Sequence, residues 1–145
     1  MKKAVFAAAC LLILLCFCGC KPKEINQMET TPKETITIIN EFKQADVWLL
    51  PETEQNLKTT LWGTATASNV QKGESRSVAL CEPGENGLYI LRMIDTDHGY
   101  YAADGIALEA GQTLQLTRQS DVLIALCRDK SGKVIGSYEV FHAAL

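Results

Sequence analysis

Three residues close together in the sequence, Asp95, Asp97 and His98, could do chemistry. Carboxylates at alternate positions can ligate calcium, and a carboxylate beside an imidazole can transfer protons. The segment lacks the later glutamate and the spacing of an EF-hand loop. Aspartates followed by Gly99 are also typical of a hairpin turn. We therefore expect a turn here, with a calcium-dependent binding module or a hydrolase as alternatives.

Six cysteines form a second group. Cys81 and Cys127 lie in the body of the chain, and a bridge between them would stabilise the fold by roughly 4 kcal/mol in the chain-entropy model. Strand alternation places Cys81 on the side of Ser77 and Ala79, which we expect to be solvated. The candidate disulfide and two independent thiols therefore both stay open, because spacing alone does not determine the geometry of a bridge.

The rest of the sequence carries no further catalytic pattern. It has no nucleophile elbow, no phosphate-binding loop and no paired zinc cysteines. His142, the second of two histidines, has no partner in the neighbouring sequence. We expect no enzymatic activity, no cofactor and no bound metal, with Asp95 and Asp97 as the weak candidates if an ion site exists.

The N-terminus carries the most specific signal. Two lysines precede an unbroken apolar run over residues 4–17, which is shorter than the about 20 residues of a spanning helix. This order fits a secretory signal peptide that ends in a cleavage site of small residues. Phe17, Cys18 and Gly19 before Cys20 resemble the lipobox of bacterial lipoproteins. The resemblance implies that Cys20 is diacylated and that the chain is cut after Gly19.

The lipobox resemblance also implies a domain plan and a location. Residues 1–19 would be the signal peptide, and residues 20–34 the lipidated cysteine and a polar, flexible tether. Two or more acyl chains anchor a protein durably, since each buried methylene contributes about 0.8 kcal/mol. We expect an extracytoplasmic protein on a membrane. Lys21, where an aspartate would favour retention on the inner membrane, favours the outer membrane or cell surface.

The net charge of the chain limits which classes of binding partner are expected. The whole sequence has a net charge of −3, and loss of the signal-peptide lysines leaves the mature chain more acidic. No basic stripe is present, which argues against nucleic acid. It also argues against electrostatic docking on anionic lipid. We therefore expect the lipid on Cys20 to attach the protein to the membrane.

Strand patterns fill residues 35–145. The clearest strands cover residues 35–40, 45–50, 76–80, 88–95, 113–117, 122–129 and 134–141. Ile90 and Ile94 make the second face of 88–95 apolar, so we expect a central strand covered on both sides. Residues 52–62 read as a short helix or an irregular loop. The pattern predicts an all-β fold, an antiparallel β-sandwich of Ig-like or Greek-key type with about seven or eight strands.

Trp48 and Trp62 are candidate interaction residues. Exposed tryptophans are common where proteins contact other proteins or glycans. Large aromatics are more often mostly buried, so we favour a packing role in which both cap the ends of the sandwich core. Tyr100 and Tyr101 are adjacent in a strand, and we expect one to face inward and the other outward.

Residues 35–117 resemble a small β-sandwich domain that is widespread in bacterial secreted proteins and lipoproteins. The likeness is carried by the strand that ends in Asn40, the strand closed by Pro51, the turn 72–75, and the central strand that runs into Asp95 and Gly99. The resemblance implies a fold and a compartment, and no activity. The last hairpin, residues 122–141, extends beyond the usual pattern of these domains.

Together these features predict a non-enzymatic envelope lipoprotein. Its domain is expected to contact another envelope protein or the cell-wall layer. The alternative is a small lipoprotein inhibitor of a hydrolase such as lysozyme, because such inhibitors use small β-rich folds. None of their family motifs is present.

Overall fold

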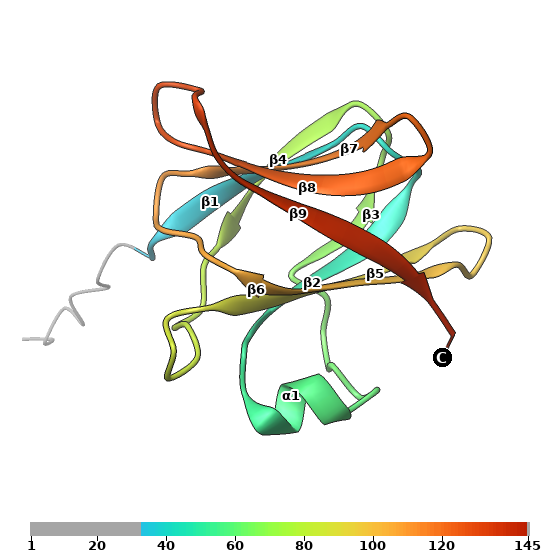
Figure 1. Cartoon of the computed structure of the whole chain (residues 1–145), viewed down its shortest axis with the longest axis horizontal. Coiled ribbons are helices and arrows are strands. Elements are labelled where there is room, and N and C mark those ends of the chain that lie inside the picture. Colours follow the sequence, from blue (N-terminus) through green and yellow to red (C-terminus); the bar gives the residue numbers. More distant parts are fainter. Residues whose placement is uncertain (1–32, 145) are drawn as a thin grey trace, which may run out of the picture. The chain divides into compact units, whose positions relative to one another are not determined.

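The structure is a computed structural model that describes residues 33–144, so Cys20 and most of the predicted tether lie outside the described residues. The described chain is nearly all β-strand, which confirms the predicted all-β class (Figure 1). Its elements are β1 (Thr35–Asn40), β2 (Ala45–Pro51), α1 (Glu54–Lys58), β3 (Ala67–Val70), β4 (Glu74–Ala79), β5 (Tyr89–Asp95), β6 (Tyr100–Ile106), β7 (Thr113–Gln119), β8 (Val122–Arg128) and β9 (Val134–Ala143).

The nine strands form one sheet in the order β3-β2-β5-β6-β9-β8-β7-β1-β4, and this sheet is nearly closed into a barrel. The long strand β9 joins its two halves. Val140 and the residues before it pair with β8, whereas Phe141 to Ala143 pair with β6. Figure 1 shows β9 crossing from the upper half, with β8, to the lower half, with β5 and β6.

Two details go beyond the sequence pattern. Residues 67–79 form two strands, β3 and β4, around a turn at Gly73, which brings the count to nine. In addition, β1 pairs with β7 in parallel, while every other pair is antiparallel. A parallel pair needs a long connection. Here the five intervening strands of the chain provide it.

Strand β5 is the most buried strand of the sheet. Its inward side chains, Tyr89, Leu91 and Met93, lie in the core with the inward residues of the other strands. The outward residues Ile90 and Arg92 are also buried. The prediction of a central strand covered on both sides is therefore confirmed.

One end of the domain is held by Asn40, which is fully buried. Its side-chain amide donates to the carbonyl oxygens of Lys43 (2.6 Å) and Val70 (2.9 Å), and its oxygen accepts from the Phe42 N–H (3.0 Å). These bonds close the turn between β1 and β2 and connect it to β3. A buried polar group is tolerated here because all its hydrogen bonds are made.

The opposite end is held by Glu52. Its carboxylate accepts from the side chain of Asn86 (2.9 Å) and from the backbone N–H of Gly105 (2.6 Å). Gly84 packs directly against the Glu52 backbone, and a Cβ there would lie 2.1 Å from the carbonyl oxygen. Only glycine fits this contact. The turn before β5 and the segment after β2 are thereby fixed together.

Both cysteines of the described chain are free thiols. Cys127 is fully buried in the core on β8, whereas Cys81 is exposed after β4, with its sulfur 3.7 Å from the Leu49 carbonyl oxygen. The candidate disulfide between them is therefore not formed in the structure. Burial raises the pKa of the Cys127 thiol to about 11 and also raises that of Cys81. Both thiols are neutral at pH 7.

These placements predict unequal reactivity. In the native protein at pH 8, we expect iodoacetamide to alkylate Cys81 slowly and to leave Cys127 unmodified, because the reagent cannot reach the core. In urea both should react, as mass spectrometry of the peptides will show. Recovery of a Cys81–Cys127 cross-linked peptide from unreduced protein would contradict the arrangement.

Candidate functional site

The turn between β5 and β6 contains the acidic residues singled out from the sequence. Asp95 is buried, and its Oδ1 accepts from the backbone N–H groups of Asp97 (2.9 Å) and Gly99 (2.7 Å). Its Oδ2 accepts from the Tyr101 hydroxyl (3.1 Å) and lies 3.4 Å from the Lys43 ammonium. The carboxylate is thus held by four donors of the fold itself. This is the hydrogen bonding of an Asp-Gly turn.

Asp97 and His98 do not join Asp95 in a reactive cluster. Asp97 is exposed and pairs with Lys43 at 2.7 Å. His98 has the positive φ of a turn residue, 62°, and an exposed side chain. Within residues 33–144, no group of three or more histidine, cysteine or acidic side chains is arranged to hold a metal ion. The turn therefore offers neither an assembled calcium site nor a histidine–carboxylate pair.

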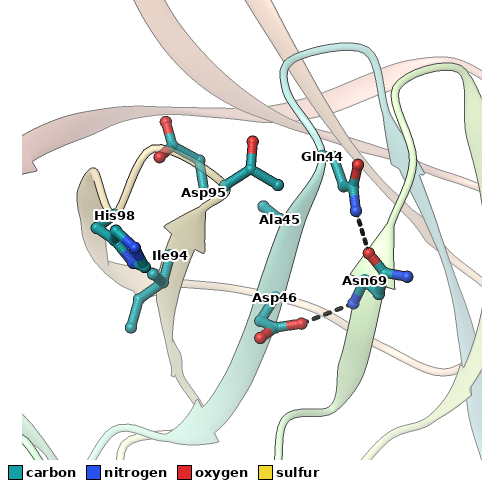
Figure 2. A pocket seen from close by; sticks show the side chains of 8 residues that line it. Gln44, Ala45, Asp46, Asn69, Ile94, Asp95 and His98 are labelled. Carbon is teal, nitrogen blue, oxygen red and sulfur yellow. Dashed lines mark hydrogen bonds between the residues drawn. The ribbon is translucent and has the colours of Figure 1, made fainter.

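A shallow pocket beside this turn has polar walls that are already paired (Figure 2). The Asp46 carboxylate accepts from the Asn69 N–H (2.6 Å), and the Gln44 amide donates to the Asn69 side chain. Figure 2 shows His98 and Ile94 on the β5 side of the pocket, away from these bonds. These bonds join β2 to β3, so the polar groups on this side of the pocket are already paired.

The hydrogen bonds at Asp95 shift its titration. Burial raises the pKa of the Asp95 carboxyl, but the Gly99 N–H, the Tyr101 hydroxyl, the Asp97 N–H and the Lys43 charge outweigh it. The net result is a pKa below the ordinary value. Because the folded-state pKa is lowered, the ionised carboxylate stabilises the fold at neutral pH, and this contribution is lost as the pH falls through the folded-state pKa.

A second group of residues forms what we call the outer aromatic cluster: Trp48, Trp62 and Tyr100. The ring centroids of Trp48 and Trp62 are 5.4 Å apart and edge-to-face, and those of Trp62 and Tyr100 are 5.2 Å apart and stacked. Trp48 comes from β2 and Tyr100 from β6, and β5 runs between these strands. Trp62 therefore spans β5 on the outside of the sheet, over the position of Arg92.

Arg92 is the charged group beneath this cluster. It is 5% exposed, although its side chain points to the outer face of β5. Its guanidinium donates to the carbonyl oxygens of Leu91 (2.9 Å) and Ala103 (3.3 Å) and to the Asp104 carboxylate (2.6 Å). A buried cation is tolerated when it is paired and hydrogen-bonded in this way. Sequence reasoning missed Arg92, although a lone arginine inside the apolar run 88–94 was the available signal.

The segment that carries Trp62 is bonded to the sheet by the indole of Trp48 and closed on itself by the indole of Trp62. Trp48 donates from its ring nitrogen to the Gly63 carbonyl (3.1 Å), and Trp62 donates to the Thr59 carbonyl (2.9 Å). At its start, the Thr53 hydroxyl caps α1 by accepting from the Asn56 N–H. Both indole donors are therefore satisfied within the protein.

The outer aromatic cluster is bordered by exposed apolar side chains. Leu61, next to Trp62, is 86% exposed, and Leu57 of α1 is 43% exposed. Phe141 of β9, 59% exposed, lies in the same row across the sheet as Trp48, because Trp48 pairs with Arg92, Arg92 with Ala102 and Ala102 with Phe141. The two tryptophans are half-buried and lie on the outer face of the sheet, whereas the packing role expected from the sequence placed them at the ends of the core.

Comparison of the chain with protein-family models, with curated proteins and with solved structures finds no match. The resemblances to lipoproteins and to the small β-sandwich domain therefore stay predictions. Within residues 33–144, no helix has the length and apolar character needed to cross a membrane.

Replacement of Asp95 tests the turn. We expect Asp95→Asn to lower the free energy of unfolding at pH 7 by about 1–3 kcal/mol, because one acceptor and the attraction to Lys43 are lost. The difference from wild type should narrow as the pH falls below about 4, because the unfolded carboxyl binds a proton there, whereas the folded carboxyl, with its lowered pKa, does so only at lower pH. Urea unfolding across pH 2–7 measures this. A difference that stays constant down to pH 2 would contradict the role of the ionised carboxylate.

Replacement of Trp62 tests the outer aromatic cluster. Trp62→Ala removes two ring contacts and is expected to cost about 1–3 kcal/mol, while the inner core keeps the protein folded. Trp62→Phe, the matched control, should retain most of the stability. Urea unfolding measures the stability of both variants, and near-ultraviolet circular dichroism measures the packing of their aromatic rings. Unchanged stability of the alanine variant would show that the cluster does not pack as described.

Proposed function

We propose that this protein is a lipid-anchored, non-enzymatic component of the bacterial cell envelope, whose outer apolar face contacts another component of the envelope. The observation that carries the proposal is this face itself: exposed Leu57, Leu61 and Phe141 around the half-buried Trp48 and Trp62. Exposed apolar patches mark interaction surfaces, since leaving them in water costs free energy. The lipobox at Cys20 supports the anchor and the compartment.

The non-enzymatic part of the proposal is supported by how the reactive groups are used. Asp95 closes a turn, Arg92 is paired with Asp104, and Cys127 is neutral and buried. A catalytic group needs a free lone pair or proton beside a cavity that can hold a substrate. The side chains bordering the outer aromatic cluster offer apolar surface instead.

The proposed location is the outer membrane or cell surface, for which Lys21 after the lipidated cysteine is the argument. The proposed partners are the membrane, through the lipid, and an envelope or cell-wall component, through the apolar face. The acidic composition supports a partner other than nucleic acid.

Metabolic labelling tests the anchor. Cells that express the full chain with radioactive palmitate are expected to label the wild type, and Cys20→Ala should lose the label and leave the membrane fraction. Cys18→Ala is the matched control and should label normally, because Cys18 is removed with the signal peptide. Label that persists in Cys20→Ala would overturn the lipid anchor.

A further inference from the structure

We propose that the outer face of the domain at α1 and the segment after it rests on the lipid bilayer, with Leu57, Leu61 and the ring of Trp62 inserted at its surface. We call these three side chains the apolar tip. The inference rests on the proposed lipid anchor and deepens it, since it names the membrane as the component that part of the apolar face contacts. The domain would then lie against the bilayer through a second contact that is apolar.

The first argument is exposure on a rigid support. Leu61 is the most exposed large hydrophobic residue of the described chain, at 86%. Its backbone is held close to the sheet, because its N–H donates to the Thr59 hydroxyl (3.0 Å) and the next residue, Trp62, stacks on Tyr100. A leucine fixed outside the fold gains from any apolar environment that reaches it, and little ordering entropy remains to be lost.

The second argument is position. Chain connectivity places the start of β1 and the end of β2 away from the turn that joins these strands. Hydrogen bonding agrees: the Leu80 N–H donates to the Glu34 carbonyl (2.8 Å), and the next residue, Cys81, contacts the Leu49 carbonyl. Because α1 follows directly after β2, it starts at the end of the domain where the chain leaves toward Cys20. The segment after α1 then crosses the outer face to Trp62, which packs on Trp48 and Tyr100.

The tether is long enough to bring the outer face to the membrane. Residues 20–34 span at most about 50 Å when fully extended. A membrane that holds Cys20 is therefore always within that reach of Glu34. Tethering turns a weak surface contact into an intramolecular one with a high effective concentration. The bilayer is thus an apolar partner that always stays within reach of the outer face.

The third argument is the chemistry of the surface. A sugar-binding face sets hydrogen-bonding groups beside its aromatic rings. Here both indole donors are already bonded, to the carbonyls of Gly63 and Thr59. The charges on α1, Glu54 and Lys58, pair with each other, and Arg92 beneath Trp62 pairs with Asp104. The tip therefore offers hydrocarbon and ring surface with no net charge, which suits the interfacial region of a bilayer, where tryptophan is enriched.

The test uses the two tryptophans of the chain, which both belong to the outer aromatic cluster, as an intrinsic probe. The full-length protein, purified from palmitate-labelled cells, is reconstituted in phosphatidylcholine vesicles whose acyl chains are brominated near the headgroup. Bromine quenches only nearby indoles. We expect at least a twofold loss of fluorescence relative to non-brominated vesicles, with no dependence on salt, because the contact is apolar.

Two variants make the test specific. Leu61→Asp should reduce the quenching by more than half, since it puts a charge at the centre of the tip while its exposure spares the fold. Val134→Asp is the matched control: Val134 is exposed to a similar extent as Leu57 but is the first residue of β9. The turn between β8 and β9 lies on the side of the domain away from α1 (Figure 1). This variant should be quenched like the wild type.

Every outcome decides the inference. Labelled protein without quenching would overturn membrane docking and leave the lipid anchor standing, whereas loss of both label and quenching would overturn the two together. Quenching without label would support docking alone. Equal quenching in Leu61→Asp, or quenching only in anionic vesicles at low salt, would overturn the apolar tip. A fluorescence change with peptidoglycan fragments or an envelope protein, in place of lipid, would assign the apolar tip to that partner.

Discussion

The structure depends on the burial of β5 on both of its faces. A nearly closed sheet has one inner core, and the outer face of a strand is normally left to water. On β5, however, Ile90 and Arg92 point outward and are buried as completely as the inward residues. Something must cover them. That cover is the segment between β2 and β3, which folds back over the outside of the sheet.

Several local features follow from this requirement. Glu52 and Gly84 fix the start of the covering segment against the turn before β5. Trp62 bridges from Trp48 to Tyr100 over the strand. Beneath it, Arg92 finds carbonyl oxygens and the carboxylate of Asp104, so that the cation is shielded without being left unpaired. The cover is thus a small second core on the outside of the sheet.

A thin cover of this kind cannot bury its own outer side. Leu57 and Leu61 remain in water because no further layer of protein lies above them in the described chain. The face that results is apolar and is held to the sheet by the contacts of Trp62 with Trp48 and Tyr100. The same folding requirement that protects β5 therefore creates the surface through which we propose the protein meets the envelope.

Local sequence patterns were sufficient to predict part of this fold. The alternation in residues 35–40 and the apolar run 45–50 predicted β1 and β2, and Ile90 and Ile94 predicted the doubly covered strand. One inward and one outward tyrosine at 100 and 101 is also confirmed. These are properties of neighbouring residues, which the chain periodicity reveals.

The features that were missed depend on residues far apart in the sequence. The parallel pairing of β1 with β7 and the division of β9 between two partners are set by the whole sheet. The stacking of Trp62 on Tyr100 joins a loop to a strand 38 residues away. The separation of the two cysteines is also set by the whole fold, because Cys127 lies in the core on β8 and Cys81 in an exposed loop. No local spacing encodes such contacts.

Hydrogen–deuterium exchange of the membrane-anchored protein tests the central claim most directly, because it locates the contact without any substitution. Exchange is compared between protein in phosphatidylcholine vesicles and protein released from its lipid by proteolysis within the tether. Slower exchange in the vesicle-bound form, confined to amides of residues 54–63, is the predicted result. Equal exchange in both forms, or slowing confined to the hairpin between β8 and β9, would contradict it.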